Sequence, residues 1–396
     1  MLPVLLLSLG CASGIRNMYE AERDAALARA PAPADGWQPD VRVRLSDSAL
    51  DGLVQATLDQ GVLAWDEQLT LTGPLGLKAK VEPAGRVRSL SLSTSRQCDG
   101  CMEVQAGLEG QANWSAAGAS GSVPFTAQVK GTVTFAVEAE GQGWAVSGRL
   151  LDVDEVKVGV DRLGSLDATD LLGDWVGQAL KEARPLALGT FGGVDLPLRA
   201  ARLSTPRGQL ELQLLTDAAD GGPVTAGVNL ASDFEVRISS ATALALARRK
   251  AFEQGVIAYD VAAVPTALAV DGGGFSMGLR LWKLQGAGWW RDYAVTGTLG
   301  VQQQQLRLTA TEAVEGEKSL GAGLVDPLAL LAEGRILEAV TEGLDQALPA
   351  STGLNVGGQQ ITARVEAVQG ARAAIELTGR LVQGQAEGST GRNLER

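Results

Sequence analysis

The chain has 396 residues, carries a net charge of −12 and contains no histidine. This acidic balance argues against nucleic-acid binding, because phosphate contacts need clustered Lys and Arg, and against recruitment to anionic membranes by charge. Without histidine, Ser-His-Asp and Cys-His catalysis and most zinc sites are excluded. Hydrophobic residues make up 45% of the chain and there are 50 glycines, which together with the length favours two strand-rich domains.

The first thirteen residues, MLPVLLLSLGCAS, form an apolar run that ends in small residues around Cys11. This run resembles a bacterial lipoprotein signal, in which the peptide is cut before the cysteine and the cysteine is acylated. A plain secretory signal and a mis-assigned start are the alternatives, since no Lys or Arg precedes the run. The resemblance implies removal of residues 1–10 and lipid on Cys11. Because Ala12 rather than Asp follows the cysteine, the resemblance also implies that the protein is located at the outer membrane, on its periplasmic side or at the cell surface.

Residues 11–40 include the Pro- and Ala-rich stretch ARAPAPADGWQPD. Such a composition is typical of a linker without a fixed fold. We therefore expect this segment to act as a tether that lets the folded body stand away from the bilayer.

The stretch at 41–66 is written a second time at 234–260. The letters RLS of the first copy return as RIS 193 positions later, and GVLAWD returns as GVIAYD 194 positions later. A period of this length indicates a domain-sized duplication rather than a short solenoid repeat. We therefore divide the chain into a first unit at 41–215, a crossing segment at 216–232, a second unit at 233–382 and a polar tail at 383–396, which we expect to be disordered.

Each copy predicts a strand followed by an amphipathic helix. Valine and leucine at 41, 43 and 45 alternate with arginine at 42 and 44, which is the two-residue period of a half-buried strand. Ser48 and Asp51 then approach a capping box, and apolar residues follow at helical spacing. The helix is expected to end in the repeated Gly-Val-aliphatic-Ala-aromatic-Asp motif.

Cys98 and Cys101 lie between two alternating runs that predict the strands of a hairpin. A CxxC pair can be a redox motif, half a zinc site or a small disulfide. A redox pair would stand at a helix start, and zinc would need two further ligands in a chain that has only Cys11 to offer. With Cys11 assigned to lipid, we expect a Cys98–Cys101 disulfide that closes an exposed hairpin outside the cytoplasm.

The remaining elements repeat in the two units. Strands are predicted through 125–160 in the first unit and 267–310 in the second, and a second helix follows each set, at Asp167–Ala183 and Asp326–Leu348. A proline ends each of these helices, and an extended segment and a final strand complete each unit.

This element order, doubled in one chain, resembles the tubular lipid-binding superfamily, whose two-unit members include the bactericidal/permeability-increasing and lipopolysaccharide-binding proteins. The resemblance spans roughly residues 41–382. It implies an α+β fold of two tandem units, each a twisted antiparallel sheet wrapped around a long helix to form an apolar tube, with a shared central sheet. Mammalian members are often strongly basic, so endotoxin neutralisation is not expected of this acidic chain, and small bacterial lipoproteins of the superfamily fit it better.

We expect a lipid-binding or lipid-shuttling lipoprotein whose partners are phospholipid or another acyl lipid and, through its N-terminus, the membrane. We expect no nucleic acid, cofactor or metal, and the sequence identifies no protein partner. Apolar helix positions are expected to line the lipid sites. In the first unit these are Leu53, Val54, Leu58, Val62, Leu172, Trp175 and Val176. In the second unit they are Leu246, Phe252, Val256, Leu337, Val340 and Leu344.

Two other classes of function remain open from the sequence. A structural or assembly lipoprotein of the envelope would have the same elements with filled cores, because a packed interior leaves no tube. An enzyme is the weaker alternative, since carboxylates such as Asp152, Asp154 and Glu155 are scattered along strand edges and their spacing does not pair them.

Overall fold

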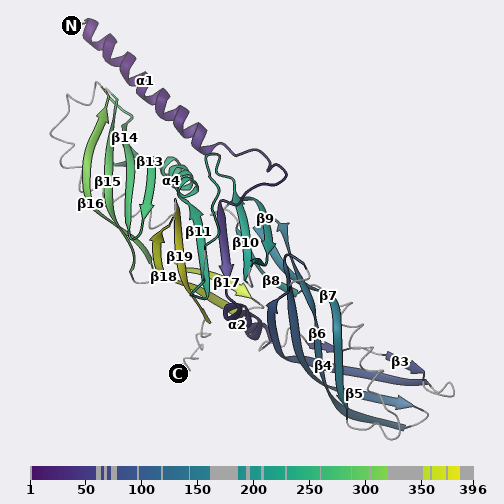
Figure 1. The fold of residues 1–396 in the computed structure, drawn as a ribbon. Helices are drawn as coiled ribbons and strands as arrows, with labels where there is room; N and C mark the ends of the chain where they lie inside the picture. Colours follow the sequence, from purple (N-terminus) through teal and green to yellow (C-terminus); the bar gives the residue numbers. More distant parts are fainter. Residues whose placement is uncertain are drawn as a thin grey trace, which may run out of the picture.

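A computed structural model describes residues 2–58, 64–66, 69–72, 78–95, 98–116, 119–141, 143–160, 186–192, 197–206, 209–227, 230–258, 260–286, 288–302, 305–319, 351–356, 359–371 and 373–383. The molecule is elongated, with one sheet at each end and a third sheet between them (Figure 1). All strand pairs of the described part are antiparallel, so the prediction of a strand-rich fold is confirmed. The predicted helices Asp167–Ala183 and Asp326–Leu348 lie outside the described residues.

The elements of the first half begin with helix α1 (Leu2–Leu27), strand β1 (Val41–Leu45) and helix α2 (Asp47–Leu58). A seven-stranded sheet then takes the order β2-β4-β5-β6-β7-β8, with β3 paired to β4. Its strands are β2 (Ala64–Asp66), β3 (Leu69–Thr72), β4 (Lys78–Thr94), β5 (Cys101–Ala116), β6 (Ala119–Glu140), β7 (Gly143–Val160) and β8 (Leu186–Gly192).

The second half contains helix α4 (Ser240–Gln254) and a five-stranded sheet in the order β12-β13-β14-β15-β16. The strands of that sheet are β12 (Val256–Ala258), β13 (Val261–Asp271), β14 (Gly274–Lys283), β15 (Trp289–Gln302) and β16 (Gln305–Lys318). Strands β13 to β16 have 10 to 14 residues, whereas β4 to β7 of the first half have 16 to 22.

The central sheet draws its seven strands from both halves, in the order β17-β18-β19-β11-β1-β10-β9. The additional strands are β9 (Leu198–Ser204), β10 (Leu210–Thr216), β11 (Phe234–Ser239), β17 (Ser351–Val356), β18 (Gln359–Gly370) and β19 (Ala374–Gln383). The halves meet where β1 pairs with β11, with Val43 opposite Val236. Val41 lies opposite Ile238 and Leu45 opposite Phe234, so the two copies of the repeated strand are related by an approximate two-fold axis through the Val43–Val236 pair.

The two helices that follow the repeated strands are capped at equivalent positions. The Ser46 hydroxyl accepts a hydrogen bond from the Ala49 N–H (3.1 Å), and Ser239 accepts one from the Thr242 N–H (3.0 Å). The predicted capping box of Ser48 and Asp51 is therefore wrong. The Asp51 carboxylate instead accepts a hydrogen bond from the Leu92 N–H (3.3 Å) on β4, which ties α2 to the sheet.

The described residues of the repeated Gly-to-Asp motif form short strands, β2 in the first half and β12 in the second, and do not continue a helix. At the second copy, Gly255 has a φ of 69°, a value that favours glycine, and this residue ends α4. In the second copy the motif is therefore a helix stop followed by the first strand of the sheet.

The crossing segment lies on the polar face of the central sheet. Arg42 donates to the Val224 carbonyl (2.9 Å), and Arg44 donates to the Gly227 carbonyl (3.1 Å). A Cβ on Gly227 would stand 2.3 Å from the Arg44 guanidinium and 2.6 Å from Glu235, so a larger residue at 227 would displace one of these side chains. The segment therefore shields charged side chains from water instead of joining the sheet as a strand.

Candidate functional site

The outer part of the first unit carries an apolar cluster made entirely of strand residues among those described. We call it the distal cluster. Its fully buried members are Val81, Leu108, Ala112, Phe125, Ala127 and Val129, from β4, β5 and β6. Along β6, residues 125, 127 and 129 are buried and residues 126, 128 and 130 are exposed, as the pleat of a strand requires. One face of a long sheet is thereby apolar well beyond the reach of α2.

A second cluster joins the inner part of that sheet to α2 and the central sheet. Leu50 and Val54 of α2 pack with Met102 and Val104 of β5 and with Leu210 of β10. Val54, predicted to line a lipid site, is 5% exposed in this cluster. The cluster is the joint between the first unit and the centre of the molecule.

In the second unit, the apolar faces of the five-stranded and central sheets pack against each other. Phe275, Leu279 and Val295 share a cluster with Phe234 and Ile375 of the central sheet. Leu246 of α4, another predicted lining residue, is partly buried against this cluster. The interior here is a sheet-on-sheet core.

Two predicted lining residues of the second unit are placed elsewhere. Phe252 is buried against Tyr19 and Trp282, on the face of the five-stranded sheet opposite the sheet-on-sheet core, because neighbouring residues of β14 point to opposite faces. Val256 is 48% exposed on β12 instead of continuing the helical stripe. The helical periodicity was extended too far, since α4 ends at Gln254.

The remaining predicted lining residues are placed only in part or not at all. Leu53 is half-buried on α2, and Leu58 ends α2 with a side chain outside the described set. The others lie outside the described residues: Val62, Leu172, Trp175, Val176, Leu337, Val340 and Leu344.

The N-terminal segment is not a free tether over its whole length. Cys11 lies within α1, and the helix continues to Leu27 along the second unit. The Tyr19 ring is 5% exposed, with its centroid 5.3 Å from Phe252 and 5.8 Å from Trp282. The expectation that 11–40 is a tether is therefore wrong at 15–27, where apolar side chains dock the helix on the second unit. The Pro- and Ala-rich composition on which that expectation was based belongs only to the residues after the helix.

Ion pairs fix α1 in the same position. Glu22 lies 3.2 Å from Arg280 of β14 and 3.6 Å from Arg248 of α4. Arg280 also makes a bidentate pair with Asp292 (2.6 and 2.8 Å) and stacks on the Trp290 ring. Asp292 and Glu22 raise the pKa of the Arg280 guanidinium, which stays charged, and the hydrogen bond to Asp292 has the largest effect.

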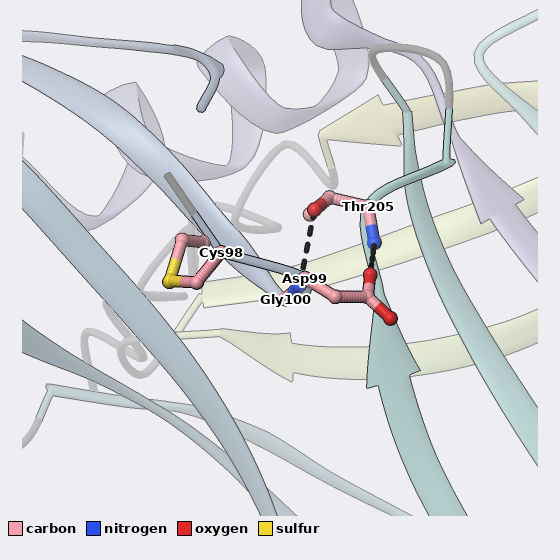
Figure 2. Close-up of a disulfide and its surroundings, with 5 residues drawn as sticks. Cys98, Asp99, Gly100 and Thr205 are labelled. Atoms are coloured by element: carbon pink, nitrogen blue, oxygen red, sulfur yellow. Dashed lines mark hydrogen bonds between the residues drawn. A yellow bond between two sulfur atoms is a disulfide. The ribbon is translucent and has the colours of Figure 1, made fainter. Parts of the chain in front are cut away.

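Cys98 and Cys101 form a disulfide at the turn between β4 and β5 (Figure 2). The turn is not an exposed hairpin tip, because Cys101 is 1% exposed. The Gly100 N–H donates to the Thr205 hydroxyl (3.0 Å), and the Asp99 carboxylate accepts from the Thr205 N–H (2.9 Å). The disulfide thus stiffens a turn that fastens the first unit to the central sheet.

The polar face of the central sheet was missed by sequence reasoning. Arg44 and Glu235 form a buried bidentate pair (2.6 and 3.0 Å) between β1 and β11. Arg42 pairs with the fully buried Glu211 of β10, and Arg237 lies 3.6 Å from Glu376 of β19. The strand alternation correctly put the arginines on one face, but their burial comes from the crossing segment, nearly two hundred residues away in the chain.

The carboxylates considered for catalysis lie on the surface of β7. Glu155 pairs with Lys157 (2.6 Å) and Lys130 (3.6 Å). These contacts lower the pKa of the Glu155 carboxyl, and the hydrogen bond from Lys157 has the largest effect. Asp152 accepts a hydrogen bond from the Val153 N–H (2.8 Å), and Asp154 is exposed. Within the described ranges, no group of three or more Asp, Glu or Cys residues is placed to hold a metal ion.

No helix in the described part of the chain is both long and apolar enough to cross a membrane.

No protein-family model matches the sequence, and no curated protein matches it. Among solved structures, the fold is similar to that of lipopolysaccharide binding protein, at 10% identity and a TM-score of 0.42 over 88% of this chain and 100% of that one. It is similar to P47 from Clostridium botulinum A2 (9% identity, TM-score 0.40, 86% and 97%) and P47 of Clostridium botulinum E1 (10%, 0.40, 87% and 99%). These likenesses are too distant to carry an argument about ligands.

Proposed function

We propose that the protein is a lipid-binding or lipid-shuttling lipoprotein of the bacterial envelope, which holds acyl chains against the apolar sheet face of its first unit. The observation that carries the proposal is the distal cluster. It extends a continuous aliphatic face along β4, β5 and β6, beyond the region where α2 packs. The finer picture, a sheet closed around a helix as a tube, belongs to the same proposal.

Aliphatic walls suit acyl chains because they offer shape tolerance and require no hydrogen bonds. Each buried methylene contributes about 0.8 kcal/mol. A chain of about sixteen carbons would therefore gain roughly 12 kcal/mol before the cost of ordering it is subtracted. This gain is relative to water and is similar to what the acyl chain loses on leaving a bilayer, so transfer between bilayer and protein would be close to balanced, as a shuttle requires.

The second unit favours the alternative of a structural or assembly lipoprotein with filled cores. Its five-stranded sheet packs directly on the central sheet through residues such as Phe275 and Phe234. We therefore assign lipid binding to the first unit and a scaffold role to the second.

Membrane attachment is proposed to occur through acylated Cys11. The support is the apolar run that ends in Leu9-Gly10-Cys11. Cys11→Ser should move the protein from the membrane fraction to the soluble fraction. Unchanged membrane association of that variant would remove the anchor from the proposal.

The lipid site is tested by placing larger side chains in the distal cluster, so that less space is left for an acyl chain. Ala127 is 2% exposed within it, and Thr126 is exposed on the opposite face of the same strand. Native mass spectrometry of gently extracted wild type should show bound phospholipid, Ala127→Trp should abolish the adduct, and Thr126→Trp should keep it. Val129→Phe is the second test variant, and thermal unfolding establishes that each variant is folded. Wild type that carries no lipid and binds no fluorescent acyl probe would make the first unit a filled core.

A further inference from the structure

One end of the second unit exposes two consecutive large apolar residues. Val256 and Ile257 of β12 are 48% and 38% exposed. Successive side chains of a strand point to opposite faces, so a strand on a covered sheet ordinarily buries one of them. β12 is also an edge strand, since among the described strands it pairs with β13 alone. Edges of soluble sheets are commonly protected by charges or proline, and this one is apolar.

The same end of the sheet carries aromatic side chains. Val256 pairs with Ala262, Ala262 with Trp282, and Trp282 with Trp290, so these residues form one row across four strands. Trp282 is fully buried, and Trp290 and its neighbour Trp289 are half-buried, so only the last two present ring surface at this end. Tryptophan is enriched where proteins meet the interface of a bilayer, because its ring is apolar and its N–H is polar.

Helix α1 leads to this end. It runs antiparallel to α4, because Arg249 of α4 donates to the Ala28 carbonyl while Phe252, one turn further on, packs on Tyr19. Ile15 therefore lies near the end of α4, where it joins the cluster that contains Trp290. The N-terminal end of α1 projects past the ends of β14, β15 and β16 (Figure 1).

The helix leaves little length between the proposed anchor and the docked body. Ile15 is four positions after Cys11, which is about 6 Å of helix rise. The Pro/Ala-rich stretch comes after the docked helix and so adds no reach. A lipid on Cys11 would therefore hold the end that carries β12 at the bilayer surface.

We propose that this end of the second unit, with Val256 and Ile257 at its edge, inserts into the interfacial layer of a phospholipid bilayer. The proposal rests on the acylated anchor of the proposed function and adds an orientation, in which the first unit points away from the membrane. Apolar contact drives the insertion, since a chain with a net charge of −12 gains nothing from anionic headgroups. The nearby Lys283 is engaged by Asp260 at 3.4 Å.

The test places an environment-sensitive label at the edge. Ile257→Cys is labelled with a nitrobenzoxadiazole dye in the acylated, disulfide-intact full chain, which is reconstituted into phosphatidylethanolamine/phosphatidylglycerol vesicles. Leu151→Cys is the matched control, because Leu151 is 56% exposed on β7 of the first unit. We expect a blue shift and at least a twofold loss of emission with headgroup-proximal doxyl lipid at 257, neither effect at 151, and no change with salt. Val256→Cys should behave like Ile257→Cys.

The outcomes separate this proposal from the one on which it rests. If the protein stays on the vesicles and carries lipid while the 257 label remains in water, the orientation is wrong and the proposed function stands. If Cys11→Ser leaves vesicle binding unchanged, the anchor itself is wrong. If the 257 label is shielded without vesicles and the protein is a dimer, a second copy covers the edge and the bilayer proposal is overturned.

Discussion

Asp40 is a buried carboxyl, 2% exposed, at the point where the chain enters β1. It accepts hydrogen bonds from the Thr216 N–H (2.9 Å) and the Thr216 hydroxyl (2.5 Å). Burial raises the pKa of the Asp40 carboxyl above its ordinary value, and the Thr216 hydrogen bonds only partly offset this effect. The folded protein thus binds this proton more tightly than the unfolded chain does. The contribution of Asp40 to stability is therefore present below the ordinary aspartate pKa of about 4 and is lost as pH rises through the folded pKa.

Asp40→Asn should remove this pH dependence. The amide oxygen still accepts from the Thr216 N–H, and the amide nitrogen can donate to the Thr216 hydroxyl oxygen. The free energy of unfolding of the variant, relative to wild type, should be lowest at pH 4 and rise towards pH 8. Urea titrations at pH 4, 6 and 8 measure the difference, and a difference that does not vary with pH would contradict the assignment.

The Arg44–Glu235 pair joins the two halves, with side chains 5% and 3% exposed. Glu235→Gln should lower the free energy of unfolding by about 3–5 kcal/mol, because it leaves a buried guanidinium without its counter-charge. The double variant Arg44→Met, Glu235→Met should lower the free energy of unfolding by less than the sum of the losses in the single variants Arg44→Met and Glu235→Met. At the exposed Arg86–Glu109 pair, Glu109→Gln serves as the control and should cost less than about 1 kcal/mol. Additive costs at the buried pair would show that it contributes no coupling.

Among the elements, α1 depends on Tyr19 for its docking, since the ring fills the space between Phe252 and Trp282. Tyr19→Ala should weaken the docking of α1 on the second unit by a free energy on the order of 3 kcal/mol and so release the helix. Hydrogen exchange of residues 15–27 should rise accordingly, while Met18→Ala, at a position 46% exposed, should leave it unchanged. Unaltered exchange in Tyr19→Ala would mean that the ion pairs of Glu22 hold the helix by themselves.

The Cys98–Cys101 turn is held by more than its disulfide. The bridge closes a very short loop, so its entropic contribution is roughly 2 kcal/mol at most. Replacing both cysteines with serine should cost no more than this, because the bonds from residues 99 and 100 to Thr205 remain. Thiol titration of the unreduced, denatured wild type should find neither cysteine free. Two reactive thiols, or one bound metal per chain, would refute the pairing.

For the whole molecule, β1 is the strand through which the two halves share one sheet, because it pairs with β10 on one side and β11 on the other. We expect wild type to unfold in a single transition in which β5 and β14 lose exchange protection together. Val43→Pro removes an N–H from the middle of β1 and should separate the two losses, whereas Val43→Thr should not. Two separate transitions in wild type would mean that the central sheet does not couple the halves.

Much of this architecture was predictable, because local patterns specify it. The alternation at 41–45 and the helix that follows depend on residues close in sequence, and the duplication is visible in the letters themselves. The docking of Tyr19 on Trp282 and the burial of Arg44 under Gly227 join segments far apart in the chain, and each partner looks ordinary in its own stretch. Sequence reasoning named no strand residue of the proposed lipid face for a related reason. Glycine- and alanine-rich strands such as β5 are only weakly apolar by composition, although Ala112 and Leu108 are buried there.

The pairing of β1 with β11 about Val43 and Val236 has a consequence for fragments of the chain. Two copies of β11 in this register would form an isologous interface that sets Glu235 against Arg237 twice. Two copies of β1 would instead set Arg42 against Arg44 twice, and like charges would repel. Proteolysis within the crossing segment, followed by loss of the first half, would therefore leave a second half that self-associates through β11. A liberated first half has no such route, and the fused chain keeps both edges occupied by each other.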